Sequence, residues 1–292
     1  PATDVTQPLL VKKKAQTITF AALSGKTYGD ATFELTATAT SGLTVSYAAT
    51  PGTVCTLTGN MVHVTGAGAC TITGSQAGNG NYEAALDAAQ SFVIAKKAQH
   101  LAFGPLADKT YGDPDFAVTA TTDSDSGVPV TFAATGNCTV SGSTVHVTGP
   151  GSCVVTASQA GNSNYDAAAA VARSFNSIVS WSNLLPPINL DGSSVFKSGS
   201  TVPVKFRLAG ASSGLSNVKA FLLAGFVTNA IVGSELEVAS TSAADAGNQF
   251  RYDGDGQYIF NLSTKALGRT GTWQLRIDLG DGVTHTVLVS LK

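Results

Sequence analysis

Four cysteines are the residues whose type and spacing most clearly predict chemistry in this chain. They form two pairs, Cys55 with Cys70 and Cys138 with Cys153, and the members of each pair are fifteen positions apart in the sequence. Zinc sites use closer pairs or accompanying histidines, whereas adjacent strands can bring two such cysteines within bridging distance. Because the pair recurs as a pair, we predict two disulfides in preference to buried free thiols. Each bridge would stabilise its domain by about 3 kcal/mol through loop closure, and disulfides indicate an oxidising location outside the cytoplasm.

The four histidines are the only obvious general bases in the sequence. His63 and His146 stand at the same position relative to the two cysteine pairs, and each is flanked by valines. In a strand they would therefore point away from the core. His100 and His285 lie near no nucleophile motif such as Gly-x-Ser-x-Gly, and the sequence contains no glycine-rich phosphate loop. The sequence thus predicts no catalytic residue, no cofactor and no enzyme.

Aspartates gather at two turns near the C-terminus, and this raises the question of a calcium site. The residues are Asp253, Asp255, Asp278 and Asp281. Calcium prefers clustered carboxylate oxygens, but a tight hairpin also requires Asp-Gly for its backbone alone. No glutamate follows at the spacing of a calcium loop, so we predict hairpin turns and no metal site. Asp30 and Asp113 are likewise predicted to accept hydrogen bonds from local backbone N–H groups.

The elements that position these residues occur twice along the chain. The sequence repeats itself with a constant offset of 83 residues, so that Tyr28-Gly29-Asp30 returns as Tyr111-Gly112-Asp113. A unit of this length can enclose its own core, which predicts two tandem domains. We call residues 15–97 repeat 1 and residues 98–179 repeat 2. Apolar and polar residues alternate within each repeat, as along residues 33–39, and this predicts the antiparallel strands of a β-sandwich.

The two repeats resemble bacterial immunoglobulin-like repeats of the MBG type. The motifs that carry the resemblance are the openings Ala15–Phe20 and Ala98–Phe103, the Tyr-Gly-Asp triplets, the Gly-x-Cys segments, and the closing segments Gln76–Tyr82 and Gln159–Tyr165. The resemblance covers roughly the first 178 residues. It implies an immunoglobulin-like fold in an extracellular, multidomain bacterial surface protein, where such repeats act as spacers or adhesive stalks.

Residues 180–292 are predicted to form a third β domain, which lacks cysteines. Ser180–Pro187 is interpreted as a linker because paired prolines do not continue a sheet interior. Beyond it, Phe221–Val227 reads as a core strand, and Asp-Gly turns predict two hairpins. Gly199–Phe206 resembles the namesake motif of bacterial PxKF domains, which implies another β-sandwich of secreted and surface proteins. Trp273 alternates with core residues and is predicted to be buried, whereas Trp181 is predicted to be exposed.

Residues 1–14 are interpreted as the last strand of a preceding repeat together with a linker. The candidate assembly residues are Gln7, Leu9, Leu10 and Val11. They align with Gln90–Ile94 of repeat 1, and Lys12–Lys14 align with the basic residues that follow. Three fates are open to this apolar segment. It is unpaired in a fragment of a longer array, it folds back onto its own chain, or it is donated to a sheet of a neighbouring molecule. Donation would give a head-to-tail contact and, without ring closure, a filament.

Composition excludes several classes of partner. Charged residues make up 12% of the chain and the net charge is -2, so there is no electrostatic attraction for nucleic acid or an acidic membrane surface. No apolar run approaches the roughly 18 residues that a membrane helix requires.

The sequence as a whole predicts an all-β chain of three tandem immunoglobulin-like β-sandwich domains. We expect an extracellular structural protein of a bacterial cell surface, either a stalk or adhesin or a filament subunit. Its expected partners are copies of itself or neighbouring domains of the same array. The alternative is a binding module that recognises a surface glycan or protein through the loops of the C-terminal domain, with Trp181 as an aromatic platform.

Overall fold

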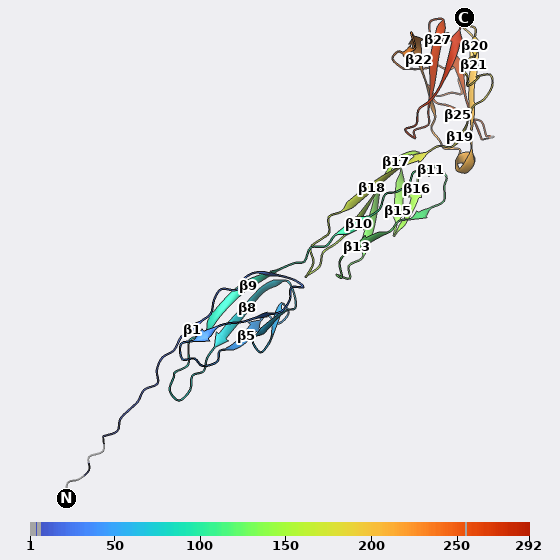
Figure 1. The fold of residues 1–292 in the computed structure, drawn as a ribbon. Helices are drawn as coiled ribbons and strands as arrows, with labels where there is room; N and C mark the ends of the chain where they lie inside the picture. Colours follow the sequence, from blue (N-terminus) through green and yellow to red (C-terminus); the bar gives the residue numbers. More distant parts are fainter. Residues whose placement is uncertain (1–3, 5–6, 255) are drawn as a thin grey trace. The chain divides into compact units, whose positions relative to one another are not determined.

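The computed structural model describes residues 4, 7–254 and 256–292, and its regular structure consists of β-strands with one 3₁₀ helix, η1 (Gly210–Gly214) (Figure 1). The chain divides into two compact units. The first unit runs to His100 and includes Thr122–Pro129 and Gln159–Ala169, and the second comprises Leu101–Thr121, Val130–Ser158 and Ala170–Lys292. Two loop segments of repeat 2 therefore belong to the same unit as repeat 1. Within the described residues, no helix combines the length and apolar character needed to cross a membrane.

Repeat 1 is a sandwich of a four-stranded and a three-stranded sheet, in the orders β2-β9-β8-β5 and β3-β7-β6, with a short β1-β4 pair. Its strands are β1 (Ile18–Thr19), β2 (Lys26–Thr27), β3 (Phe33–Glu34), β4 (Thr38–Ala39), β5 (Ser46–Thr50), β6 (Cys55–Thr58), β7 (Met61–Val64), β8 (Gly68–Ser75) and β9 (Ala88–Ala95). Alternate residues such as Val62 of β7 and Ile72 of β8, together with Leu35 directly after β3, are buried between the sheets and form the core.

Repeat 2 has the same topology, with sheets β11-β18-β17-β14 and β12-β16-β15 and a β10-β13 pair. Its strands are β10 (Leu101–Phe103), β11 (Lys109–Thr110), β12 (Phe116–Ala117), β13 (Ala120–Thr122), β14 (Val130–Gly136), β15 (Cys138–Ser141), β16 (Thr144–Val147), β17 (Gly151–Gln159) and β18 (Val171–Ile178). The repeat in the sequence is thus a repeat in strand order and pairing.

The C-terminal region forms a third sandwich, with sheets β19-β21-β26-β25 and β20-β28-β27-β22-β23, and with β24 also paired to β22. Its strands are β19 (Trp181–Leu184), β20 (Val195–Phe196), β21 (Thr201–Leu208), β22 (Phe221–Thr228), β23 (Ile231–Val232), β24 (Leu236–Glu237), β25 (Arg251–Tyr252), β26 (Gln257–Ser263), β27 (Gly271–Asp278) and β28 (His285–Leu291). Its core is dominated by large side chains, including the stacked rings of Phe206 and Tyr258. The predicted fold class, all-β with tandem immunoglobulin-like sandwiches, is confirmed.

The predicted strands and hairpins of the C-terminal domain are confirmed. The core strand expected at residues 221–227 is β22. Tyr252 pairs with Tyr258 across the first predicted hairpin, and Ile277 pairs with His285 across the second. Trp273 is buried, as its alternation with core residues predicted.

The linker predicted at Ser180–Pro187 is wrong in its first half. Residues 181–184 form β19, which pairs antiparallel with β21. The two prolines follow this strand, so they mark its end and do not prevent its formation. The Trp181 ring, predicted to be exposed, packs edge-on against Phe206 at 5.4 Å and against His285 at 4.7 Å between ring centroids. It is therefore part of the domain's packing and only half-exposed.

A parallel pair at one edge is common to the three sandwiches. The last strand runs parallel to an early short strand in each case, as β9 with β2, β18 with β11 and β28 with β20. The chain therefore leaves each repeat beside the strand that precedes its Tyr-Gly-Asp triplet.

Candidate functional site

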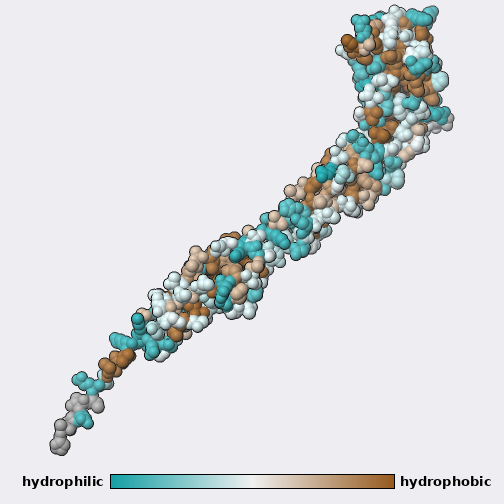
Figure 2. Space-filling view, viewed as in Figure 1, coloured by the Kyte–Doolittle hydropathy of each residue, from teal (hydrophilic) through white to brown (hydrophobic). Residues whose placement is uncertain are grey.

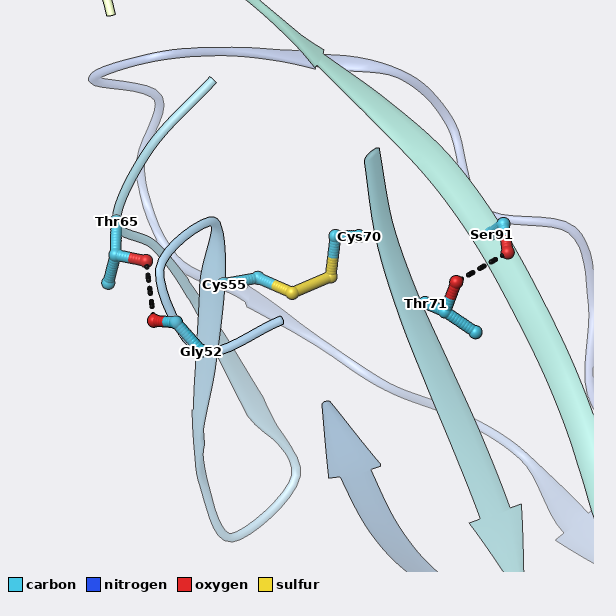
Figure 3. Close-up of a disulfide and its surroundings, with 6 residues drawn as sticks. All are labelled: Gly52, Cys55, Thr65, Cys70, Thr71 and Ser91. Carbon is cyan, nitrogen blue, oxygen red and sulfur yellow. Dashed lines mark hydrogen bonds between the residues drawn. A yellow bond between two sulfur atoms is a disulfide. The ribbon is translucent and has the colours of Figure 1, made fainter. Parts of the chain in front are cut away.

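Both predicted disulfides are present. They join Cys55 to Cys70, with 6.0 Å between the Cα atoms, and Cys138 to Cys153, with 5.6 Å. The strand arrangement expected from the sequence is wrong, because the bridged strands are not neighbours in one sheet. Cys55 lies on β6 of the three-stranded sheet and Cys70 lies on β8 of the four-stranded sheet, so the bridge crosses the core. Figure 3 shows this bridge and the Thr71–Ser91 hydroxyl contact of 2.7 Å between β8 and β9.

The Tyr-Gly-Asp turns hold themselves together through their aspartates. Asp30 Oδ2 accepts a hydrogen bond from the backbone N–H of Thr27 at 2.9 Å, and Asp113 Oδ2 accepts the equivalent bond from Thr110 at 2.8 Å. The predicted role of both aspartates is confirmed. The intervening Gly29 has a φ of 92°, a conformation that other residues rarely adopt. The tyrosine side chains are thereby presented at the end of each sandwich.

In the first unit, the turn of repeat 1 packs against the loop Asn162–Tyr165 of repeat 2. The rings of Tyr28 and Tyr165 meet edge to face, with centroids 5.5 Å apart. Asn164 Oδ1 accepts a hydrogen bond from the backbone N–H of Ala67 at 3.0 Å. This set of contacts, which we call the repeat junction, leaves Tyr165 only 5% exposed.

Charged groups reinforce the repeat junction. Lys96 Nζ donates a hydrogen bond to the carbonyl oxygen of Asn162 at 2.7 Å, and Lys97 Nζ lies 5.9 Å from the centre of the Tyr165 ring. The Tyr165 hydroxyl donates a hydrogen bond to Asp125. This bond lowers the pKa of the Asp125 carboxyl and raises the pKa of Tyr165 to about 12. The pair therefore remains as phenol and carboxylate across the neutral range.

In the second unit, the equivalent turn of repeat 2 packs against the C-terminal domain. The carbonyl oxygen of Tyr111 accepts a hydrogen bond from Ser212 Oγ at 2.7 Å, and its hydroxyl accepts one from Asn217 Nδ2 at 3.0 Å. Gly112 approaches η1 so closely that an added Cβ would collide with the carbonyl oxygen of Ala211. Both Tyr-Gly-Asp turns are therefore packed into a neighbouring module, a role of the tyrosines that the sequence analysis missed.

A buried aspartate also joins repeat 2 to the C-terminal domain. Asp281 Oδ2 accepts a hydrogen bond from the backbone N–H of Val179 at 3.0 Å, and Asp281 Oδ1 accepts one from Val283 at 2.9 Å. The sequence analysis assigned Asp281 to a hairpin turn, and the structure adds this contact with the end of repeat 2. Asp278 Oδ1 accepts a hydrogen bond from the backbone N–H of Gly280 at 2.9 Å within the predicted turn, and Asp278 Oδ2 accepts one from Arg276. Asp255 lies outside the described residues.

The predicted assembly residues form no strand in the structure. Gln7, Leu9, Leu10 and Val11 lie in an extended segment outside regular structure, and residues 9, 10 and 11 are 87%, 81% and 80% exposed. Figure 2 shows this segment as a hydrophobic patch beside hydrophilic atoms. The structure begins to pair at Lys14, which forms a parallel bridge with Tyr82, as Lys97 does with Tyr165. The two lysines, predicted as linker residues, thus each pair with the repeat that follows them.

Three of the four histidines make contacts with single polar side chains near the surface. His63 Nε2 contacts Thr58 Oγ1 at 3.1 Å, and His146 Nδ1 lies 2.6 Å from Asp115 Oδ1. His100 bonds to Asp123, whose carboxyl pKa is lowered by these hydrogen bonds. Across the described ranges, no three His, Cys, Asp or Glu side chains gather closely enough to hold a metal ion.

Comparison with known proteins identifies no family. No family model matches the chain, and no curated protein does. Among solved structures, Drosophila N-cadherin EC1-4 is 12% identical over 98% of this chain and 74% of its own, with a TM-score of 0.25. A tetra-tandem repeat from the extending region of a large adhesion protein is 14% identical over 95% and 74%, with a TM-score of 0.35. A 1.5-MDa bacterial ice-binding adhesin is 10% identical over 96% and 97%, with a TM-score of 0.26. Such low scores establish neither kinship nor function, so the functional argument rests on the chain's own contacts.

Proposed function

We propose that this protein is an extracellular structural protein, a multidomain stalk or adhesin or a filament subunit of a bacterial cell surface. The observation that carries this proposal is the use of both Tyr-Gly-Asp turns as docking elements. The Tyr28 turn packs on Tyr165, and the Tyr111 turn packs on Ser212 and Asn217. A stalk has to transmit force from one domain to the next, and packed joints with directional hydrogen bonds serve that purpose.

The disulfides support an extracellular location. They cross the cores of the two repeats, where reducing agents have little access, since Cys55, Cys70 and Cys153 are fully buried. Such bridges persist in oxidising compartments and add stability to small domains.

The segment Gln7–Val11 is proposed to act as the assembly strand. It aligns with Gln90–Ile94 of β9, whose Ile94 pairs in parallel with Lys26 of β2. Leu9 and Val11 correspond to Phe92 and Ile94, both buried, so the segment has apolar residues where a last strand needs them. Within the described residues, β9, β18 and β28 already fill this position in the three sandwiches. The acceptor is therefore an immunoglobulin-like repeat whose last-strand position is open, and donation to it gives a head-to-tail contact.

Electron microscopy tests the assembly strand on copies of the chain in which a flexible linker replaces Gln90–Ile94, so that the last-strand position of repeat 1 is open, and on a variant of these copies that lacks residues 1–11. A matched control keeps the length of the segment and replaces Leu9, Leu10 and Val11 with serine. Because these side chains are exposed, both variants should fold with unchanged thermal stability. Loss of filaments in both supports strand donation, whereas unchanged filaments overturn it. Short monomeric rods in every sample would leave the stalk as the function and remove self-assembly.

The stalk itself is tested at its joints. Tyr28→Ala and Tyr111→Ala should broaden the distribution of angles between modules in micrographs of single molecules. Thr56→Ala, which changes an exposed residue of β6 in repeat 1, serves as the control. Unchanged distributions in both tyrosine variants would contradict the structural role of the turns.

A ligand-binding module is the second candidate function, because repeat 1 has an open groove. Its lining includes Leu35, Val45, Tyr47, Leu57 and Asn60, a mixture of apolar and amide groups of the kind that binds sugars or peptides. The aromatic platform expected at Trp181 is packed against Phe206, which weakens this alternative. A glycan panel that shifts the fluorescence of Tyr47→Trp would favour binding in the groove, and an unresponsive variant would favour the scaffold.

A further inference from the structure

Repeats 1 and 2 carry the same loop at the end where the chain enters. In repeat 2, Asn162 Oδ1 accepts hydrogen bonds from the backbone N–H groups of Asn164 and Tyr165 at 2.8 and 2.9 Å. In repeat 1, Asn79 Oδ1 accepts the equivalent bonds from residues 81 and 82 at 2.8 and 3.0 Å. The entering lysine bonds to each loop in the same way, from Lys97 N to the residue 164 carbonyl at 2.9 Å and from Lys14 N to the residue 81 carbonyl at 2.8 Å. The two loops therefore present the same groups in the same arrangement.

The two loops differ in what covers them. Tyr165 is buried and Asn162 and Asn164 are half-buried, because the Tyr28 turn lies on them. The residues that correspond to them in repeat 1 are more open. Tyr82 is half-buried, and Asn79 and Asn81 are exposed. We call Lys14, Asn79, Asn81 and Tyr82 the entry face of repeat 1.

The position of the assembly strand fixes what would reach this face. Thr27 of β2 pairs in parallel with Ala95, and the N–H of Tyr28 donates a hydrogen bond to the carbonyl of Ala95 at 2.9 Å. Two residues later, at Lys97, the chain enters the next loop. By the same register, Lys12 corresponds to Ala95 and Lys14 to Lys97. A repeat that takes Gln7–Val11 as its last strand therefore brings its own Tyr-Gly-Asp turn to the entry face.

We infer that the entry face of repeat 1 is a docking surface for the Tyr-Gly-Asp turn of another immunoglobulin-like repeat, one completed by Gln7–Val11. This inference rests on the proposed function of that segment as a strand. The tyrosine of the incoming turn packs edge-on against Tyr82, as Tyr28 does against Tyr165. Asn81 Oδ1 accepts a backbone N–H from the incoming repeat, as Asn164 Oδ1 does from Ala67. Lys13 takes the place of Lys96, whose Nζ bonds to the loop carbonyl.

The occupant is distinct from the turns of this chain. The Tyr28 turn is engaged with Tyr165, and the Tyr111 turn is engaged with Ser212 and Asn217. A repeat that docks on the entry face therefore needs a Tyr-Gly-Asp turn of its own and an open last-strand position, and it must be of the same kind as repeat 1.

The test extends the full chain with a second copy of residues 15–89 placed directly before Gln7, so that Gln7–Val11 replaces Gln90–Ile94 in the added copy. Double-mutant cycles are then measured by chemical denaturation for two tyrosine pairs in this one molecule. The test pair is the added counterpart of Tyr28 with Tyr82, and the internal control is Tyr28 with Tyr165. An edge-to-face pair should give a coupling of roughly 2- to 12-fold in the unfolding equilibrium constant. We expect similar couplings for the two pairs.

A coupling factor of one for Tyr82, with normal coupling at Tyr165, would overturn the docking surface. A second extended chain separates this result from failure of the strand, since it keeps Gln90–Ile94 of the added copy in place of Gln7–Val11. If the added repeat folds only in this second chain, Gln7–Val11 does not act as a last strand. The proposal that Gln7–Val11 completes the docked repeat is then also wrong. If it folds in both chains and Tyr82 is coupled in both, strand and docking surface are supported together.

Discussion

Reduction of the disulfides should lengthen the unfolding step of each repeat by a fixed amount when the chain is stretched. A stalk works under tension, and the bridges Cys55–Cys70 and Cys138–Cys153 remove a segment of each repeat from the extensible chain. The cysteines of each pair are fifteen positions apart in the sequence. Mechanical unfolding of an oxidised repeat therefore cannot extend this segment.

The magnitude follows from chain geometry. Fifteen residues extended at about 3.4 Å each span about 50 Å. The bridge of repeat 1 holds its Cα atoms only 6.0 Å apart. Reduction should therefore add about 45 Å to the contour length released when repeat 1 unfolds, and repeat 2 should gain nearly the same amount because its sequence separation is identical.

Single-molecule force spectroscopy with and without a thiol reductant measures this change. The double variant Cys55→Ser and Cys70→Ser should show the longer step in repeat 1 under oxidising conditions, while repeat 2 keeps the shorter step. The C-terminal domain, whose sequence has no cysteine, is the internal control and should be unaffected. Equal step lengths before and after reduction would refute the reasoning, because they would mean that the bridges do not shorten the chain released when a repeat unfolds.

Four further outcomes follow from the structure. Replacing Cys55 and Cys70 with alanine should lower the calorimetric melting temperature of repeat 1 by about 12–24 °C, because loss of the loop closure costs about 3 kcal/mol; an unchanged transition would contradict this. The Tyr165–Asp125 bond needs a carboxylate and a phenol. Its contribution to folding stability should be complete above the ordinary aspartate pKa near 3.9 and should be lost as pH falls through the lowered pKa of Asp125. It should be lost again in strong alkali, where Tyr165 ionises. Asp125→Asn should flatten the acid limb of stability against pH, and an unchanged limb would exclude this pair as its source. In urea denaturation, Trp181→Ala should destabilise the C-terminal domain by about 3 kcal/mol and Trp181→Phe by much less. Equal, small losses of stability in the two variants would show that the ring is not packed. Tyr111→Phe removes the bond to Asn217 and should cost about 1 kcal/mol, while the same change at Tyr28, which packs on Tyr165 through its ring, should cost less.

The sequence predicts the sandwiches well because alternation and turn chemistry are local signals. The alternation along residues 33–39 places Leu35 on an inward face, the position of Val62 beside the outward-facing His63 does the same, and both residues are buried. The Asp-Gly hairpins and the bonds of Asp30 and Asp113 depend only on a few neighbouring residues. These features survive into the structure because no distant segment competes with them.

The features that the sequence did not reveal depend on distant segments. The spacing of Cys55 and Cys70 indicates a bridge, but it does not state which sheet each strand joins. β19 is short and ends at two prolines, so its pairing with β21 can be recognised only when that partner is in place. The role of Tyr28 needs the position of Tyr165, more than a hundred residues along the chain. Sequence repetition identifies Tyr28 and Tyr111 as equivalent without showing what either of them contacts.

Within each Tyr-Gly-Asp triplet, the aspartate stabilises the turn and the tyrosine contacts the neighbouring module. Asp30 and Asp113 bond only within their own turns, so the shape of the turn does not depend on the partner. Tyr28 contacts repeat 2 through its ring. Tyr111 contacts the C-terminal domain through its carbonyl and hydroxyl groups. Because the turn is the constant part, specificity must reside in the receiving surface, which is an Asn-x-Asn-Tyr loop in repeat 2 and the η1 region in the C-terminal domain. If the receiving surface is transferred to a different module and the turn is left unchanged, that module should therefore dock on the turn.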